Sequence, residues 1–230
     1  MKYKNLTIIG TSHIAKQSIE EVKSAFKEIK PGIVALELDE KRFAALRYKK
    51  KRKAGLRDIL RIGLKGYLFS LIGGFVSRKL GKLVGVVPGS EMITAINLAK
   101  KNKTRVALID QDIEITLKRF SRYFSWKEKF NFIADFFKGI FVREISFDLR
   151  KVPSEKVIER LIGKVKQRYP NVYKVLVYER NIIMARNLSK LMKEIPDKEI
   201  LVIIGAGHEK DVLDLIKKPD ISYSFSFNIG

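Results

Sequence analysis

The sequence predicts an α/β fold in which a central, mainly parallel sheet is flanked by helices. Four short runs rich in β-branched residues are continuously apolar rather than alternating, which is typical of strands buried on both faces. They cover residues 6–10, 33–38, 105–109 and 200–205. Helical patterns follow the first and the last run, and such alternation of strands and helices implies a parallel sheet. We therefore expect one domain over residues 1–230, which is long enough to bury a substantial core.

The helix after the first run is predicted from its start signal and its apolar periodicity. Ser18 and Glu21 have the spacing of a capping box, and apolar residues recur at helical intervals from Ile19 to Ile29. Pro31 and Gly32 then end this helix and lead into the second strand.

Later helices are predicted in the same way. Ser154 is a candidate N-cap after Pro153, and Pro219 is a stop signal for the last helix. A closing stretch at 221–227 alternates polar and apolar residues, which predicts an edge strand. One helix is predicted to begin near Glu91, and four more are predicted over about 126–142, 154–165, 172–193 and 209–217. Residues of about 120–175 therefore form a mainly helical segment.

A basic amphipathic helical insertion is predicted at about 41–87, between the second strand and the helix that contains Glu91. Residues 41–82 contain fourteen Lys or Arg and one acid, Asp58. The whole chain has 47 Lys+Arg against 25 Asp+Glu, a net charge of +22. This excess makes an anionic membrane surface a plausible partner. Nucleic-acid binding is not favoured, because it would rest on charge alone and no recognised module is present.

Several classes of protein are excluded by composition. The chain has no cysteine, which removes disulfide frameworks, thiolate metal sites and cysteine nucleophiles. No window approaches 18 uninterrupted apolar residues, so no transmembrane segment is predicted. The apolar run near the N-terminus is too short for a signal peptide. We expect a cytoplasmic or membrane-associated protein, and the sequence leaves a homo-oligomer open.

Both histidines of the chain occur in the same local pattern. His13 and His208 each follow an apolar strand, a glycine (Gly10 or Gly205) and two further residues. Loops at the carboxyl ends of parallel strands are where ligands bind, and glycine permits close backbone approach. If the two strands are neighbours, both imidazoles enter one region, where they could bind a metal ion. The alternative is that each histidine only caps a helix or fills a loop.

Carboxylates would have to complete such a site, because a catalytic metal usually has three protein ligands. Glu37 lies at the end of the second strand, where a carboxylate is costly unless it is paired or metal-bound. Its alternative role is an ion pair with Arg42.

Four further residues are candidates for the site, each with a structural alternative. Glu91 could instead stabilise a helix N-terminus. Asp110, after the third strand, could only cap the next helix. Glu179 and Arg180 could form a surface ion pair.

Taken in order, the motifs resemble those of the TraB family of pheromone-shutdown proteins. The family is similar to the Tiki metalloproteases and belongs with the erythromycin esterase and ChaN-like proteins. The resemblance covers nearly the whole chain. It rests on Gly-Thr-Ser-His at 10–13, Glu-Leu-Asp-Glu-Lys-Arg at 37–42, Gly-Ser-Glu-Met at 89–92, Asp-Gln-Asp-Ile with Thr116 at 110–116, Glu-Arg-Asn at 179–181 and Gly-Ala-Gly-His at 205–208.

The resemblance implies an α/β fold and a metal site formed by His13, His208 and Glu37. One departure is Gln111, where relatives tend to have an arginine, and it weakens any substrate-anchoring role of that loop. Family members often carry hydrophobic segments beyond this domain.

The function we predict is metal-dependent hydrolysis of peptide substrates near a membrane surface. The metal ligands are His13, His208 and Glu37. Glu91 is the candidate base, and Arg42 or Arg180 orients a carboxylate or stabilises an oxyanion. Zinc suits these ligands best, with manganese or cobalt as alternatives. The competing hypothesis is a non-catalytic, membrane-associated protein that binds a peptide, a lipid or haem.

Overall fold

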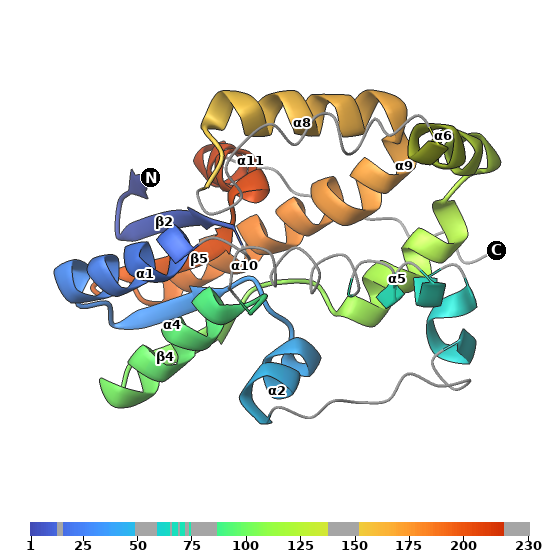
Figure 1. Cartoon of the computed structure of the whole chain (residues 1–230). Helices are drawn as coiled ribbons and strands as arrows, with labels where there is room; N and C mark the ends of the chain where they lie inside the picture. The colour runs from blue at the N-terminus through green and yellow to red at the C-terminus, as the bar shows by residue number, and fades with distance from the viewer. Residues whose placement is uncertain are drawn as a thin grey trace.

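A five-stranded sheet with helices on both faces forms the centre of the computed structural model (Figure 1). The structure describes residues 1–12, 16–48, 59–64, 66–68, 70–71, 74, 87–137 and 152–218. Within these residues the strand order is β1-β2-β5-β3-β4, and the last four strands are parallel. The strands are β1 (Lys2–Tyr3), β2 (Leu6–Thr11), β3 (Ile33–Leu36), β4 (Arg105–Leu108) and β5 (Ile200–Gly205).

The four apolar runs form the four parallel strands, which confirms the predicted fold class. Strands β3 and β5 are buried along most of their length, in agreement with their unbroken apolar sequence. Strand β3 ends at Leu36, so Glu37 lies just beyond it rather than inside it. The short antiparallel β1 has no apolar run of its own and was not predicted.

Helices α1 (Lys16–Ile29) and α4 (Ser90–Lys101) pack together on one face of the sheet. Their buried residues include Val22, Phe26 and Met92, which join Val34 and Leu36 in one apolar cluster. The predicted capping box is wrong, because α1 begins before Ser18. The buried Ser18 hydroxyl instead accepts a hydrogen bond from the Ser12 backbone N–H at 2.9 Å. Ser18 therefore fixes the backbone of Ser12, the residue that follows β2.

Helices α10 (Glu179–Glu194) and α11 (Ala206–Lys217) cover the opposite face of the sheet. Met184, Leu188 and Val212 are fully buried there against the strands. The last helix was predicted to start near Glu209, but it starts directly after β5. His208 is therefore already inside the first turn of α11.

The order of the strands produces a topological switch point at the carboxyl edge of the sheet. The chain passes from β2 through β3 to β4 with α1 and α4 on one face, and it then returns to place β5 between β2 and β3. The helices around β5 are α10 and α11, on the other face. Ligands bind at such points, where neighbouring connections leave the sheet in opposite directions.

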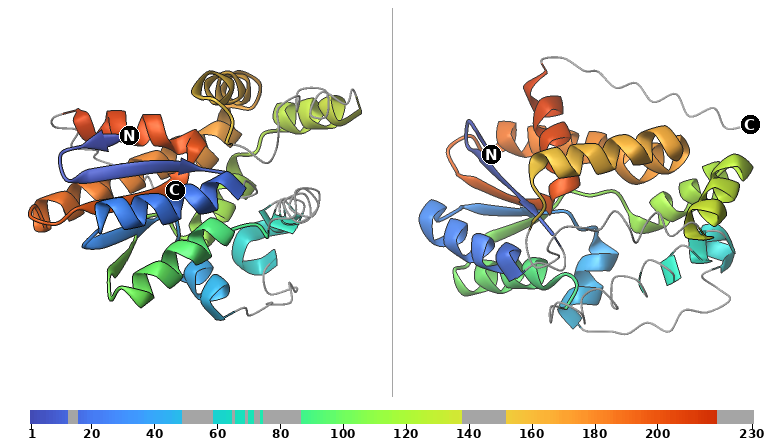
Figure 2. Two further views of the ribbon diagram at one scale, coloured as in Figure 1. Left: turned by 60° about the vertical axis from the view of Figure 1, so that its left-hand side comes forward. Right: turned by 45° about the horizontal axis from the view of Figure 1, so that its top comes forward.

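The remaining helices extend away from this carboxyl edge (Figure 2). Residues 174–178 form a π-helical turn, so the predicted helix over 172–193 is not uniform. Residues 59–64 are helical, but most of the predicted insertion at 41–87 and the predicted strand at 221–227 lie outside the described residues. The helices that lie beyond the carboxyl edge are α2 (Glu40–Tyr48), α5 (Ile113–Tyr123), α6 (Trp126–Phe137), α8 (Glu155–Arg168) and α9 (Pro170–Tyr173).

Within the described part of the chain, no helix is both long and apolar enough to span a bilayer.

The start of α6 is attached to α9 through a buried carboxylate. Glu128 is only 2% exposed and accepts hydrogen bonds from the backbone N–H groups of Ser125, Asn171 and Val172. The Ser125 hydroxyl and the Asn171 amide also donate to it. Burial alone would raise the pKa of Glu128, but these hydrogen bonds outweigh burial and lower the pKa below its ordinary value.

Replacing Glu128 with Gln should therefore destabilise the protein in a pH-dependent way. A depressed carboxyl pKa contributes stability that is present above the ordinary value of 4.5 and is lost as the pH falls through the folded-state pKa. We expect Glu128→Gln to cost about 1–3 kcal/mol at pH 7. The difference from wild type should shrink below about pH 4, measured by urea unfolding across pH. A difference independent of pH would contradict this.

Candidate functional site

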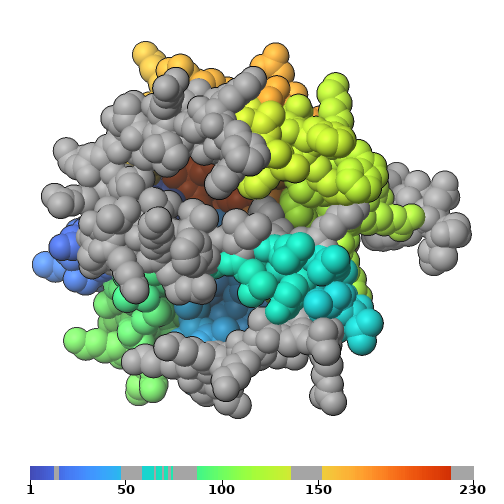
Figure 3. All heavy atoms as spheres, turned by 45° about the vertical axis from the view of Figure 1, so that its right-hand side comes forward, coloured from blue at the N-terminus to red at the C-terminus, as the bar shows by residue number. Residues whose placement is uncertain are grey.

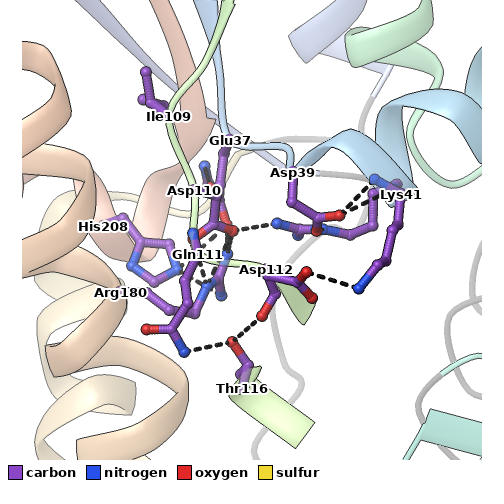
Figure 4. A network of polar contacts seen from close by, with 12 residues as sticks. Glu37, Asp39, Lys41, Ile109, Asp110, Gln111, Asp112, Thr116, Arg180 and His208 are labelled. Carbon is purple, nitrogen blue, oxygen red and sulfur yellow. Dashed lines mark hydrogen bonds and ion pairs between the residues drawn. The ribbon is translucent and has the colours of Figure 1, made fainter. Parts of the chain in front are cut away.

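The carboxyl edge of the sheet brings together polar residues from distant parts of the chain (Figure 4). Thr11 at the end of β2 is in register with Gly205 at the end of β5. Glu37 continues from β3 beside β5, because its backbone N–H donates to the Ile203 carbonyl at 3.1 Å. Asp110 follows β4 on the other side of β3. The ends of all four parallel strands therefore contribute to one region.

Arg180 of α10 is the centre of this region. Its guanidinium forms ion pairs with Glu37 and with Asp110, to which Nη2 donates at 2.6 Å. Nε donates to the same Asp110 carboxylate at 3.1 Å, and Nη1 donates to the Leu176 carbonyl at 3.2 Å. The remaining contact of Nη1 is with His208 Nε2, at 3.4 Å. One buried cation thus links α10 to both neighbouring strand ends and to α11.

The guanidinium of Arg180 stays charged in spite of its burial. Burial alone would lower the pKa of Arg180, but the carboxylates of Glu37 and Asp110 raise it above its ordinary value. Those carboxylates are 5% and 9% exposed as residues, so they need this compensating charge. The expected surface pair between Glu179 and Arg180 is therefore absent, and both residues make buried contacts with other partners.

A second arginine extends the network toward α2. Arg42 donates to Asp39 through Nε at 2.5 Å and also pairs with Asp110. The alternative pairing of Glu37 with Arg42 is wrong, because Arg180 is the arginine that reaches Glu37. Asp39 further accepts from the backbone N–H groups of Lys41 and Arg42, so it caps the start of α2. Arg42 keeps 29% of its side chain exposed, against 15% for Arg180.

Asp110 does not cap the helix that follows it. Asp112 has that role, because it accepts from the Glu114 backbone N–H at 2.7 Å. Gln111, at the position where an arginine was expected by resemblance, donates its amide to the Thr116 hydroxyl at 3.0 Å. Its side chain therefore braces the first turn of α5.

A chain of hydrogen bonds fixes which ring nitrogen of His208 carries the proton. Asn181 Nδ2 donates to the Asp211 carboxylate at 3.1 Å, so the Asn181 carbonyl oxygen is the atom that faces His208. Nδ1 of His208 lies 2.5 Å from that oxygen and must donate to it. Nε2 then carries a lone pair, and it lies 3.5 Å from Glu37 Oε1. Metal-binding histidines are commonly oriented in this way.

The glycine before each histidine permits close packing at the strand ends. A Cβ at Gly205 would lie 3.2 Å from Glu37 Oε2, which accepts a hydrogen bond from the Gly205 N–H. A Cβ at Gly10 would lie 3.1 Å from the Cα of Ala206. A larger residue at Gly205 would therefore displace Glu37, and one at Gly10 would separate β2 from the start of α11.

The other predicted site residues are placed less completely. Glu179 forms a two-bond ion pair with Arg119 of α5, at 2.7 Å for both bonds, and this pairing was not predicted. Glu91 is 1% exposed in the first turn of α4. Because α4 runs antiparallel to the strand that follows it, this turn lies at the carboxyl edge of the sheet. His13 lies outside the described residues.

Two donor atoms of the predicted metal site lie close together. Tetrahedral zinc ligands at about 2.0–2.1 Å from the ion are about 3.4 Å apart, close to the 3.5 Å between His208 Nε2 and Glu37 Oε1. Arg180 now contacts both atoms, so a metal ion would replace those contacts. Among the residues that the structure describes, no group of three or more His, Asp or Glu side chains is arranged to hold a metal.

Sequence reasoning missed Asn181 and Asp211 as functional residues. Asp211 lies one helical turn after His208, and Asn181 directly follows Arg180. Asp211 and His208 share a face of α11, but Asn181 reaches them from α10. The sequence does not show that α10 and α11 pack together, so this group could not be predicted.

Comparison with known proteins places this arrangement in a family. The model of the TraB/PrgY/gumN family matches residues 2–224. The chain belongs to this family. An uncharacterized protein of Methanocaldococcus jannaschii is 33% identical over 221 residues, which cover 93% of this chain and 54% of that protein. The TraB domain-containing proteins of Mus musculus and Homo sapiens are both 22% identical over 232 residues, or 87% of this chain and 60% of theirs. This TraB-family chain thus spans little more than half the length of these relatives.

Removing the charge of Arg180 should destabilise this TraB-family domain strongly. Arg180→Met leaves Glu37 and Asp110 without their buried cation, and we expect a loss of about 3–5 kcal/mol in urea unfolding at pH 7. Lys190→Met, in the same helix but 74% exposed, is the matched control and should stay within about 0.5 kcal/mol of wild type. Equal midpoints for both variants would contradict the central role of Arg180.

The proton of His208 should be found on Nδ1. The chain has two histidines, so long-range ¹H–¹⁵N spectra of the wild type and of a His13→Gln variant assign each ring. We expect His208 to be the Nδ1–H tautomer at neutral pH, because Asn181 accepts that proton. Asn181→Leu should abolish this preference, whereas Asn187→Leu, in the same helix, should preserve it. An Nε2–H tautomer in the wild type would refute the assignment.

Proposed function

We propose that this TraB-family chain is a metal-dependent hydrolase whose substrates are peptides. The observation that carries the proposal is the orientation of His208, whose Nδ1 lies 2.5 Å from the Asn181 carbonyl oxygen and whose Nε2 lies 3.5 Å from Glu37 Oε1. The pairing of β2 with β5 supports it, because Gly10 and Gly205, the first residues of the two Gly-x-x-His motifs, lie at the ends of neighbouring parallel strands. His13, His208 and Glu37 would then hold the metal, with zinc favoured over manganese or cobalt.

A bound divalent ion would supply Lewis acidity that makes water a nucleophile at neutral pH. The protein side chains have separate tasks. Asn181 and Asp211 hold the imidazole of His208 in its ligand tautomer. Glu91 is our candidate for the base, since it is a buried carboxylate at the same edge of the sheet.

The two arginines divide the remaining tasks. Arg180 is saturated by Glu37, Asp110 and Leu176, so we assign it a positioning role. Arg42 is more exposed and is the better candidate to meet a substrate carboxylate or a developing oxyanion.

A non-catalytic binding protein is the second candidate. The observation that favours it is that Arg180 already satisfies both His208 and Glu37, which makes the polar cluster complete without a metal. Such a protein would bind a peptide, a lipid or haem at a membrane. A Soret band in the purified protein would identify haem.

The deciding measurement is the metal content of protein purified without a histidine tag. We expect about one divalent ion per chain in the wild type and none in a folded His13→Ala/His208→Ala variant. Asp214→Asn, which changes an exposed carboxylate of the same α11, should retain the ion. Chelator-sensitive cleavage of a fluorogenic peptide library should follow the metal content. No ion in the wild type after addition of zinc, manganese or cobalt would exclude the metal site and favour the binding protein.

A further inference from the structure

Helix α6 is inverted, with its polar side against the protein and its apolar side toward solvent. Glu128 and Asp135, seven residues apart, are 2% and 3% exposed. Trp126, Phe130 and Ile133 lie on the other side, with spacings of four and three residues, and they are 73%, 68% and 51% exposed. A surface helix normally places its apolar stripe in the core.

The inward polar side is firmly attached, so the outward apolar side has a fixed direction. Asp135 accepts two hydrogen bonds from Arg168, at 2.8 and 2.6 Å, and one from the Tyr169 hydroxyl at 2.6 Å. Burial and the nearby Asp135 carboxylate raise the pKa of Tyr169 to about 12, so its hydroxyl remains a donor. Turning α6 to bury its apolar stripe would break these bonds and those of Glu128.

A second helical stretch presents leucines in the same manner. Leu60, Leu64 and Leu68 recur every four residues and are 87%, 57% and 47% exposed. This stretch packs against α5, since a Cβ at Gly66 would lie 2.6 Å from the Leu117 carbonyl oxygen. Space-filling and ribbon views place it and α6 on the same side of the molecule, away from the sheet (Figure 3).

The positive charge of the protein favours an anionic partner on this side of the molecule. The chain carries +22 net charge, and two lysines of α6, Lys127 and Lys129, flank the apolar stripe. Lys129 Nζ lies 3.5 Å from the centre of the Trp126 ring. Tryptophan beside cations, on a helix with an exposed apolar face, is typical of helices that lie in the headgroup region of a bilayer.

We propose that α6 docks this protein on an anionic lipid surface. Trp126, Phe130 and Ile133 enter the boundary between headgroups and acyl chains, and the lysines remain at headgroup level. The leucines of residues 60–68 make a second contact with the same surface. Each lysine or arginine near such a surface adds to the attraction, and salt weakens it. This docking is independent of the chemistry at His208.

The docking can be followed directly, because Trp126 is the one tryptophan of the chain. Vesicles of phosphatidylcholine with about 30% phosphatidylserine should shift its emission to the blue and protect it from acrylamide. Pure phosphatidylcholine vesicles, or high salt, should give a much smaller change. No blue shift with the anionic vesicles would overturn the proposal.

Matched variants separate the helix from general surface charge. Phe130→Ser/Ile133→Ser keeps Trp126 as the reporter. This double variant should bind anionic vesicles more weakly than the wild type, by a factor of about ten or more. Val87→Ser removes an apolar side chain that is 68% exposed elsewhere, and it should bind like wild type. Unchanged binding of the double variant, or equal weakening by both variants, would refute docking through α6. Burial of Trp126 that depends on protein concentration without lipid would instead assign this face to a second copy of the chain.

Discussion

The buried guanidinium of Arg180 is the constraint on which the carboxyl edge of the sheet depends. Glu37 and Asp110 follow two neighbouring strands whose interiors are apolar, and neither carboxylate could be charged there without a cation. Arg180 comes from the opposite layer, on α10, and also contacts His208. A single side chain therefore ties the helical layer to the strand ends and sets the distance between the imidazole and Glu37.

The position of β5 explains why this edge can become a site. Insertion of β5 between β2 and β3 places the strand ends that carry Gly10 and Gly205 side by side, with α1 and α11 on opposite faces of the sheet. The glycines let the strand ends approach closely, and Asn181 with Asp211 then fixes the lone pair of His208 toward Glu37. The same geometry suits a metal ligand pair and a hydrogen-bonded polar cluster, which is why metal content separates the two functions.

Helix α6, beyond the sheet, is oriented by its buried carboxylates rather than by its apolar residues. In α6 the carboxylates of Glu128 and Asp135 form the inner contacts, because Arg168, Tyr169 and Asn171 donate hydrogen bonds to them, and Trp126 and Phe130 face outward. An outer apolar face of this kind is costly in water unless another surface covers it. The site and α6 share one feature, since in both places buried carboxylates pair with an arginine of another element.

The sequence by itself determined the four parallel strands, because each is a short, mostly apolar run and helical patterns alternate with these runs. Of the four, β3 and β5 are buried along most of their length, as strands covered on both faces are. The sequence also determined that Glu37, Asp110 and His208 follow the ends of strands at the carboxyl edge of the sheet. Only the tertiary structure decided that Arg180 rather than Arg42 pairs with Glu37 and that Ser18 binds the backbone of Ser12 instead of capping α1. It also decided that the apolar side of α6 faces outward. These choices join residues distant in sequence or select one side of a helix. Local patterns cannot specify them, because the free energy of a buried charge depends on which partner the packed layers bring within reach.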